Sequence, residues 1–253
     1  MSDRRVEDAP TENADAVLTG ATKRRYVTGM FARIAGRYDL MNTVMTFGRD
    51  ERWRQLTVRV ARPSPGSVIL DMGTGTGRIA AALAGRGAKV WALDLTYEMM
   101  RRGREEMEAD PHLREAARAV CFVQGDALRL PLEDAAFDAA TSGFTLRNVT
   151  DVRAALAEMR RVVRPGGRVI VLEASQPPLL PVRLGHRLYL RVMVPLLGRV
   201  IAGDADAYSY LRASMIRFYD APGLADLMRE VGLHDVRYKR LMFGSVAIHV
   251  GRR

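Results

Sequence analysis

Short apolar runs alternate with amphipathic stretches through the middle of the chain. Each run is five to seven residues long, as buried strands commonly are. The predicted strands cover residues 68–72, 89–94, 120–124, 137–143 and 168–173. Apolar positions at helical spacing fill residues 78–86 and 97–108, and Asp151 caps a third helix that runs to about Val163. This alternation predicts a parallel sheet with helices on both faces.

The last part of the chain follows a different pattern. Residues 222–231 read as a helix, and residues 236–242 and 245–251 read as two strands joined at Phe243-Gly244. Such a hairpin adds an antiparallel strand at the edge of an otherwise parallel sheet. The sequence therefore predicts an α/β fold with a doubly wound, mostly parallel seven-stranded sheet and a C-terminal antiparallel hairpin.

The rest of the chain is assigned to segments around this sheet. Residues 1–22 are polar and are predicted to be a disordered tail. Residues 23–62 have helical spacing and are predicted to form lid helices. Residues 176–221 form an insertion after the fifth strand, on the expected substrate side. We predict a single domain over residues 23–253.

Composition narrows the class of protein. The chain has 253 residues and a formal net charge of +10, which suits an anionic partner such as nucleic acid, a membrane surface or an acidic ligand; an arginine-rich solvated surface is the alternative. The single cysteine excludes an intrachain disulfide. No secretory signal is visible, so a cytoplasmic location is expected. The histidines and Cys121 lack metal-ligand spacing, and we predict no metal.

A glycine-rich motif, Asp-Met-Gly-Thr-Gly-Thr-Gly at residues 71–77, lies where the first strand turns into a helix. Gly73, Gly75 and Gly77 allow a tight turn and a close ligand approach. Their spacing, Gly-x-Gly-x-Gly, differs from the Gly-x-Gly-x-x-Gly of dinucleotide-binding proteins. A turn of this kind predicts a nucleotide-like cofactor other than a dinucleotide.

Acids at the ends of three successive strands sharpen this prediction. Asp71 would repel a pyrophosphate but favours the ammonium and sulfonium of S-adenosylmethionine. Asp94 is placed to accept hydrogen bonds from both ribose hydroxyls, and Asp126 from the adenine amino group. Together with the glycine turn, these acids resemble the class I methyltransferase signature and predict S-adenosyl-L-methionine as cofactor.

Nucleic acid is not the expected substrate, despite the positive charge. Enzymes that methylate adenine often carry Pro-Pro after the fourth strand, where residues 141–148 have none. Cytosine C5 enzymes need a cysteine nucleophile, but Cys121 lies within the third strand, where we expect a buried core residue.

Several longer motifs match one family in order. The first motif is Tyr-Asp-Leu-Met-Asn at residues 38–42, and it continues with residues 45–48 and Trp53. A second covers residues 161–167 and 172–175, and residues 144–151 lie between these two. Further along are residues 203–211 with Ser214, and residues 247–251. From about Tyr26 to its C-terminus the chain resembles the ubiquinone/menaquinone biosynthesis C-methyltransferases. The resemblance implies C-methylation of a prenylated hydroquinone, demethylmenaquinol or its ubiquinone-pathway equivalent, so that a lipophilic quinol is the expected partner.

The resemblance also implies roles for individual residues. Because arginine is effectively always protonated, Arg147 is expected to stabilise a phenolate rather than act as a free base; a structural salt bridge with Asp151 is the alternative. Asn148 is expected to orient the ring hydroxyl, and Asp39 to belong to the lid. His249 is a distant candidate for the base. The expected cofactor contacts are Asp71, Gly73, Gly75, Thr76, Gly77, Asp94, Leu95, Asp126, Ala127, Gly143 and Tyr38.

Four positions depart from the family pattern. Thr46 stands in place of the usual Ser, Asp50 in place of a His, and Thr145 in place of a Gly. Arg78 stands where an acid is common. These changes leave the identity of the quinol open. Another aromatic or polyketide-like substrate remains an alternative, as do a dinucleotide-dependent oxidoreductase and a non-catalytic cofactor-binding subunit.

Residues 176–202 are the most apolar stretch of the chain. Arg183, Arg187 and Arg191 recur in it at intervals of four, and Arg199 follows. We expect this basic stripe to face anionic head groups at the inner face of the membrane. A core-packed or homodimer-forming helix is the alternative.

Overall fold

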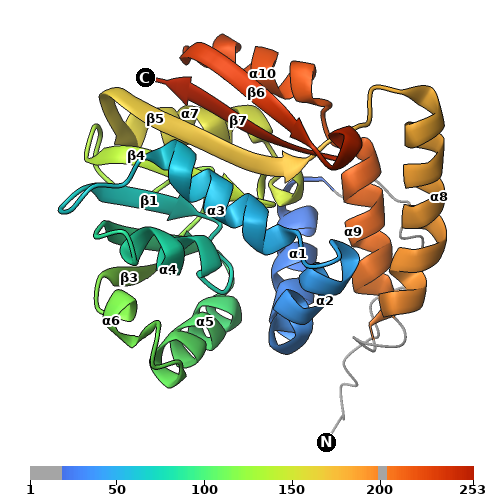
Figure 1. Ribbon diagram of the computed structural model, residues 1–253, viewed down its shortest axis with the longest axis horizontal. Coiled ribbons are helices and arrows are strands. Elements are labelled where there is room, and N and C mark those ends of the chain that lie inside the picture. The colour runs from blue at the N-terminus through green and yellow to red at the C-terminus, as the bar shows by residue number, and fades with distance from the viewer. Residues whose placement is uncertain (1–18, 199–203) are drawn as a thin grey trace, which may run out of the picture.

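The computed structural model describes residues 19–198 and 204–253, and its centre is a seven-stranded sheet (Figure 1). The strands are β1 (Val68–Met72), β2 (Lys89–Asp94), β3 (Val120–Gln124), β4 (Phe137–Gly143), β5 (Val163–Ala174), β6 (His234–Leu241) and β7 (Val246–Arg252). Their order is β3-β2-β1-β4-β5-β7-β6, and only β7 pairs antiparallel with its neighbours β5 and β6. The predicted mixed, mostly parallel sheet is confirmed. Strand order reverses between β1 and β4, which is where open α/β sheets bind ligands.

Two local predictions in the sheet were wrong. β5 begins at Val163 rather than Arg168, because the chain is already extended through Pro165–Gly167 and a register shift against β4 absorbs the extra residues. Gly166 has φ 79°, which favours glycine. Cys121 is exposed rather than buried, since β3 is an edge strand.

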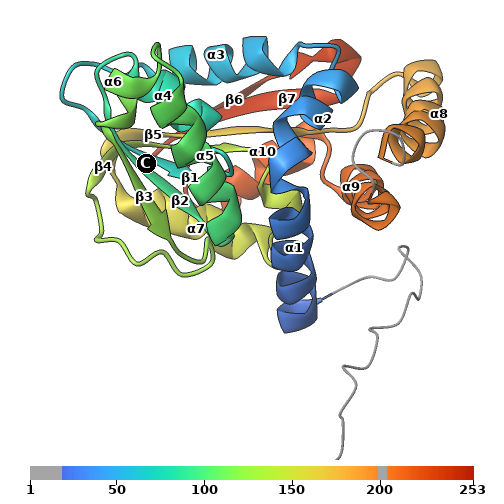
Figure 2. The same cartoon turned by 90° about the horizontal axis from the view of Figure 1, so that it is seen from below.

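Helices cover both faces of the sheet, as Figure 2 shows. One face carries α3 (Asp50–Ala61) and α4 (Arg78–Ala84), whose apolar residues share a core with Ile69, Val90 and Ile170. The other carries α7 (Val152–Val162) and α10 (Ala221–Glu230). Helices α5 (Tyr97–Ala109) and α6 (Arg114–Ala117) follow β2. Asp151 caps α7 as predicted, accepting a hydrogen bond from the Ala154 amide.

A separate core lies beyond the carboxyl ends of the strands. It joins α1 (Gly20–Ile34) and α2 (Tyr38–Met45) to α8 (Leu180–Leu197) and α9 (Ala205–Arg217), which are far apart in the sequence (Figure 1). Buried methionines from the first pair and buried tyrosines from α9 pack together there. We call these four helices the cap. The lid segment and the insertion thus form one unit.

The cap has different limits from the predicted lid. Helix α3 lies within the predicted lid segment, yet Trp53, Val58 and Ala61 pack it onto the sheet. Helix α1 begins at Gly20, so the last residues of the predicted tail are helical, and the tail up to residue 18 lies outside the described residues. No helix in the described part of the chain is long and apolar enough to span a bilayer.

Candidate active site

A cavity lies at the carboxyl ends of β1, β2 and β4, beneath α1, and we call it the polar cavity because the strand-end acids line it. Most of the predicted cofactor contacts line it, together with one predicted catalytic residue. They are Tyr38, Asp71, Gly73, Gly75, Thr76, Asp94, Leu95, Asp126, Ala127, Gly143 and Asn148. Residues from five separate segments of the chain thus meet in one cavity, four of them at the ends of parallel strands.

Gly77 is the one predicted cofactor contact that does not line this cavity. It is the N-cap of α4 with φ 75°, and a Cβ atom there would lie 2.5 Å from Met107 Cε and 3.1 Å from Phe122 Cζ. Glycine at this position therefore serves the turn and the packing behind it.

The first two strand-end acids hold the glycine turn in place. Asp94 accepts hydrogen bonds from the backbone amides of Gly75 and Thr96, each at 2.8 Å. Asp71 accepts from the hydroxyls of Thr74 at 2.7 Å and Thr141 at 2.8 Å. Both carboxylates are thus structural parts of the cavity floor, with lone pairs left for a second partner.

Burial changes the titration of both acids. Removal from water raises the pKa of Asp71 to about 6, with the threonine hydrogen bonds opposing the shift. Burial also raises the pKa of Asp94, against hydrogen bonds from the backbone. A cavity floor of this kind favours a cationic ligand, because a nearby positive charge would stabilise the ionised carboxylates.

Helix α1 is fastened over the cavity at two points. Arg24 pairs with Asp126 at 2.8 Å, and Lys23 Nζ donates to the carbonyl of Val149 at 2.6 Å. Burial lowers the pKa of Lys23. Both contacts bridge the cap to loops at the strand ends, so that release of α1 would open the cavity.

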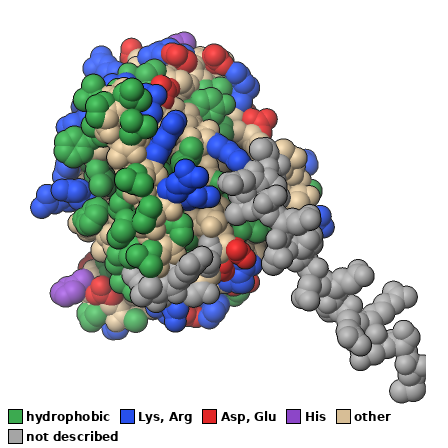
Figure 3. Space-filling view, turned by 90° about the vertical axis from the view of Figure 1, so that its right-hand side faces the viewer, with side chains coloured by type: hydrophobic (Ala, Val, Ile, Leu, Met, Phe, Trp, Pro, Cys, Tyr) green, Lys and Arg blue, Asp and Glu red, His purple; other side chains and the backbone are tan. Residues whose placement is uncertain are grey.

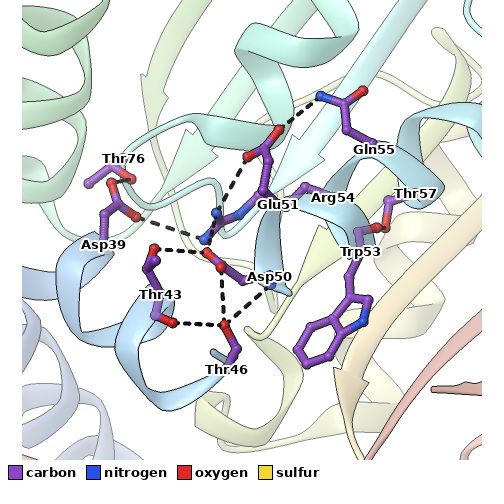
Figure 4. A network of polar contacts seen from close by, with 10 residues as sticks. All are labelled: Asp39, Thr43, Thr46, Asp50, Glu51, Trp53, Arg54, Gln55, Thr57 and Thr76. Atoms are coloured by element: carbon purple, nitrogen blue, oxygen red, sulfur yellow. Dashed lines mark hydrogen bonds and ion pairs between the residues drawn. The ribbon is translucent and has the colours of Figure 1, made fainter. Parts of the chain in front are cut away.

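A polar network on α2 and α3 continues from the wall of this cavity (Figure 4). Thr76 Oγ1 donates to Asp39 at 2.8 Å, and Arg54 lies between Asp39 and Asp50, 3.9 Å from the former and 2.6 Å from the latter. Asp50 also accepts from Thr46 Oγ1 at 3.0 Å. Two departures from the family pattern, Thr46 and Asp50, are therefore partners of each other.

A second cavity of about 400 Å³ lies between the cap and the turn that joins β6 to β7. Its wall is mainly apolar, and the lining residues come from α2, α3, α8, α9 and the 3-10 turn Met242–Gly244. Among them are Met45, Phe47, Trp53, Val182, Tyr189, Leu190, Met215 and Phe243. Thr46 and Asp50 belong to this wall, so the network on α2 and α3 connects the two cavities.

Phe144 borders both cavities. Its φ of 58° is unusual for a bulky residue, and its ring contacts Trp53 with centroids 6.3 Å apart. The next residue, Thr145, donates a hydrogen bond to the Gly73 carbonyl at 2.9 Å, and a Cβ atom on Gly73 would lie 2.1 Å from its Cγ2. Thr145, which stands in place of the family's glycine, thus attaches the segment between the two cavities to the glycine turn.

Arg147 lines the apolar cavity next to Phe144, which lies 5.4 Å from its guanidinium carbon. Its guanidinium forms a buried ion pair with Glu173 of β5. Asp151, the partner considered from sequence, instead caps α7. Burial disfavours the charged guanidinium, but Glu173 outweighs this effect and raises the pKa of Arg147, which stays cationic.

Buried polar atoms without a hydrogen-bond partner among the described residues cluster here. They include Arg147 Nε, Asn148 Oδ1 and the Tyr210 hydroxyl. The Asn148 amide nitrogen donates to the Phe144 carbonyl at 3.2 Å. Burial raises the pKa of Tyr210 to about 12, although Arg147 opposes the shift. Unpaired buried groups are costly, and because Arg147 lines the apolar cavity and Asn148 the polar one, their unpaired atoms make this a candidate ligand site.

His249 lies away from both cavities. Its Nε2 is 2.9 Å from the Ala221 carbonyl, its ring contacts Tyr238, and burial lowers its pKa. Its position supports a packing role under α10 and gives it no access to the lining of either cavity.

Sequence reasoning missed three polar residues of this region. Arg54 and Arg24 carry no motif signal of their own, because each acts through a partner distant in the sequence. Glu173 belongs to the family motif at residues 172–175. Its place on an apolar strand indicated a buried ion pair, since a charged residue within a buried strand needs a partner.

Comparison with known proteins agrees with this geometry. The model of the ubiE/COQ5 methyltransferase family matches residues 19–253. The chain is 45% identical over 232 residues to the demethylmenaquinone methyltransferase of Roseiflexus castenholzii, covering 90% of this chain and 94% of that protein. It is 41% identical over 227 residues to the ubiquinone/menaquinone biosynthesis C-methyltransferase of Desulfotalea psychrophila, covering 89% of each.

Among solved structures, a SAM-dependent methyltransferase from Thermotoga maritima matches with a TM-score of 0.62. The two share 21% sequence identity, over 89% of this chain and 99% of that one, so this likeness supports the fold. The family match and the relatives carry the assignment further: the chain is a methyltransferase and belongs to the ubiE/COQ5 methyltransferase family.

Proposed function

We propose that the chain methylates a ring carbon of a prenylated hydroquinone, of the demethylmenaquinol type, with S-adenosylmethionine as donor. The observation that carries this proposal is the pair of cavities that meet at Phe144, one with the strand-end acids in its wall, the other mainly apolar with Arg147 in its wall. A charged cofactor suits the first and a ring with a prenyl chain suits the second. The relatives are named as methyltransferases of demethylmenaquinone and of ubiquinone/menaquinone biosynthesis, which supports a quinol as the acceptor.

The polar cavity fits S-adenosylmethionine by its own chemistry. Gly73 and Gly75 line the cavity with positive φ, which leaves the backbone there bare of Cβ atoms. Asp94 would accept from the ribose hydroxyls, and Asp126 and Ala127 would hold the adenine. Asp71, whose pKa is raised by burial, would favour the cationic end. Bound S-adenosylmethionine would supply an electrophilic methyl group.

The apolar cavity would hold the quinol with its ring toward Phe144. Trp53 and Phe144 offer aromatic surfaces for the ring, while α8 and Phe243 offer apolar walls for a prenyl chain. Holding the ring carbon against the methyl group removes much of the entropic barrier of a bimolecular reaction. A bound ring and prenyl chain would displace water from the reacting atoms, which would strengthen electrostatic interactions there.

Arg147 would stabilise the negative charge that develops on the ring oxygen as its proton leaves. Glu173 fixes the guanidinium from one side, and Nε remains buried without a partner among the described residues. A preorganised donor aimed at developing charge is usually a large contribution to catalysis. The unpaired Asn148 Oδ1 would accept from a ring hydroxyl and orient it.

The test uses the purified full chain, a labelled methyl donor and a short-chain demethylmenaquinol analogue kept reduced. We expect one methyl group on the ring carbon, located by tandem mass spectrometry. Transfer to oxygen, or to a different aromatic acceptor in preference to the quinol, would overturn the quinol assignment. Absence of S-adenosylhomocysteine binding by calorimetry would overturn the cofactor assignment as well.

A further inference from the structure

The outward side of α8 carries an exposed apolar stripe. Leu180, Leu184, Leu188, Val192 and Leu196 follow each other at intervals of four, and Leu184 and Leu188 expose 56% and 63% of their surface. Figure 3 views the molecule from this side, and hydrophobic side chains gather there with Lys and Arg side chains beside them. Leucines in a row at a surface indicate a partner, because single exposed leucines are common but stripes are not.

Two arginines accompany this stripe. Arg187 and Arg191 are exposed on α8, and no Asp or Glu occurs between Leu180 and Leu197. Arg183, the third arginine of the predicted stripe, is half-buried and donates from Nε to the Pro177 carbonyl at 2.8 Å. Arg199 lies outside the described residues. Among the described residues, Arg187 and Arg191 are the exposed arginines of the predicted stripe.

The apolar cavity opens beside the same helix. Phe243 and Phe47 both line the cavity and expose 83% and 67% of their surface, and the Phe47 ring lies 6.2 Å from that of Tyr189 on α8. Gly185, also exposed, completes this rim on the helix itself. The exposed leucines therefore continue into the entrance of the cavity.

We propose that the outward face of α8, with Phe47 and Phe243, docks on an anionic lipid bilayer and turns the mouth of the apolar cavity toward the membrane. Leucines and phenylalanines would enter the acyl boundary while Arg187 and Arg191 meet head-group phosphates. Delivery of a quinol from the bilayer through this mouth rests on the proposed function; the docking itself does not.

Charge favours a bilayer over a second copy of the chain. A symmetric dimer would place this face against itself, so that arginines would meet arginines on a helix without acids. An anionic surface complements both the arginines and the formal net charge of +10.

The experiment measures binding of the full chain to vesicles of phosphatidylcholine alone and with phosphatidylglycerol, by co-sedimentation. We expect Leu184→Ser/Leu188→Ser to weaken binding to both by at least about tenfold. Arg187→Gln/Arg191→Gln should weaken binding about tenfold only where phosphatidylglycerol is present. The control, Arg86→Gln/Arg118→Gln, removes equal charge from exposed turns after α4 and α6 and should bind like wild type.

The outcomes separate the docking from the chemistry. Thermal melts check folding, and neither double variant touches a residue that lines a cavity, so both should methylate a short-chain soluble quinol like wild type. The docking proposal fails if wild type does not sediment with vesicles, or if the leucine variant sediments equally. It also fails if light scattering finds a wild-type dimer that the leucine variant loses. Docking without any methyl transfer would instead refute the proposed function alone.

Discussion

The polar and the apolar cavity on either side of Phe144 are built by different parts of the chain. The polar cavity is formed mainly by turns at the ends of β1, β2 and β4, whose backbone is fixed by the sheet. The apolar cavity is formed mainly by side chains of α8, with others from α2, α3 and the turn Met242–Gly244, and α2 and α8 belong to a small core separate from that of the sheet. One site is specified by backbone geometry, the other by packing.

This difference teaches where variation is tolerated. Gly73 cannot gain a side chain without displacing Thr145, and Asp94 holds two backbone amides, so most changes at the polar cavity would alter the turn itself. The departures from the family pattern are divided between the two cavities: Thr46 and Asp50 lie in the wall of the apolar cavity and bond to each other, while Arg78 and Thr145 line the polar cavity. The changes at the polar cavity thus leave its glycines and strand-end acids in place.

Replacing Arg147 is the sharpest test of this difference between the two cavities. We expect the replacement to lower turnover and to leave the polar cavity intact. Arg147→Ala should lower kcat about 100- to 1000-fold, as loss of a donor to a developing oxyanion does. Calorimetric affinity for S-adenosylhomocysteine should stay near wild type. Because Ala would leave Glu173 buried and unpaired, Arg147→Lys is measured as well, and should also lose most turnover since it lacks the planar fork.

An exposed arginine on the following helix is the control for Arg147. Arg153→Lys, which keeps its surface pair with Glu230, should change nothing. Wild-type turnover of a folded Arg147→Lys variant with saturating quinol would contradict the electrostatic role and reduce Arg147 to a structural partner of Glu173.

Asp94→Ala should act in the opposite way, on cofactor binding first. Losing charge-assisted hydrogen bonds costs about 1.5–3 kcal/mol, so affinity for S-adenosylmethionine should fall about ten- to hundred-fold. Asp94 also holds Gly75 and Thr96, so the loss includes a looser turn. Calorimetry on the variant measures this, with exposed Asp226→Ala as control. Unchanged binding by a folded Asp94→Ala protein would remove Asp94 from the site.

The pH dependence of the polar cavity should follow Asp71. Its folded pKa of about 6 lies above the ordinary 3.8, so the folded chain keeps a proton that the unfolded chain has lost between these values. The free energy of unfolding should therefore fall as pH rises through that window, by about 3 kcal/mol at most. Denaturant titrations across the window measure this slope, and Asp71→Asn should flatten it.

Cofactor affinity should also depend on the ionisation of Asp71, but it should rise with pH where the free energy of unfolding falls. A cationic ligand prefers the ionised carboxylate, so binding of S-adenosylmethionine should strengthen as pH rises through about 6 and level off above 7. Affinity that stays flat across this range in wild type would show that Asp71 does not sense the ligand charge.

The smallest expected effect comes from Thr145, in the segment between the two cavities. Thr145→Gly restores the usual family residue but removes the hydrogen bond to Gly73, which should cost about 1 kcal/mol of unfolding free energy. Turnover should change less than about tenfold, because Thr145 has no proposed part in the transfer of the methyl group to the ring carbon. Thr145→Ser keeps the hydroxyl and should retain most of the stability. A larger loss of turnover than of stability would assign Thr145 a direct role.

The sequence alone predicted the elements whose signals are local. Apolar runs marked all seven strands, and Asp151 marked the start of α7, because burial periodicity and capping depend on neighbours a few residues away. The glycine turn and the strand-end acids were likewise readable, since parallel strands end at a common edge. The family motifs pointed to Arg147 and Asn148 before any geometry was known.

Only the tertiary structure decided which distant segments meet. It separated α3 from the cap, joined α1 and α2 to α8 and α9, and gave Arg147 its partner Glu173. It also bonded the half-buried Arg183 to the Pro177 carbonyl, while Arg187 and Arg191 stayed exposed. Helical spacing states which residues share a face but not what that face meets, because packing between helices depends on shapes and charges brought together from far along the chain.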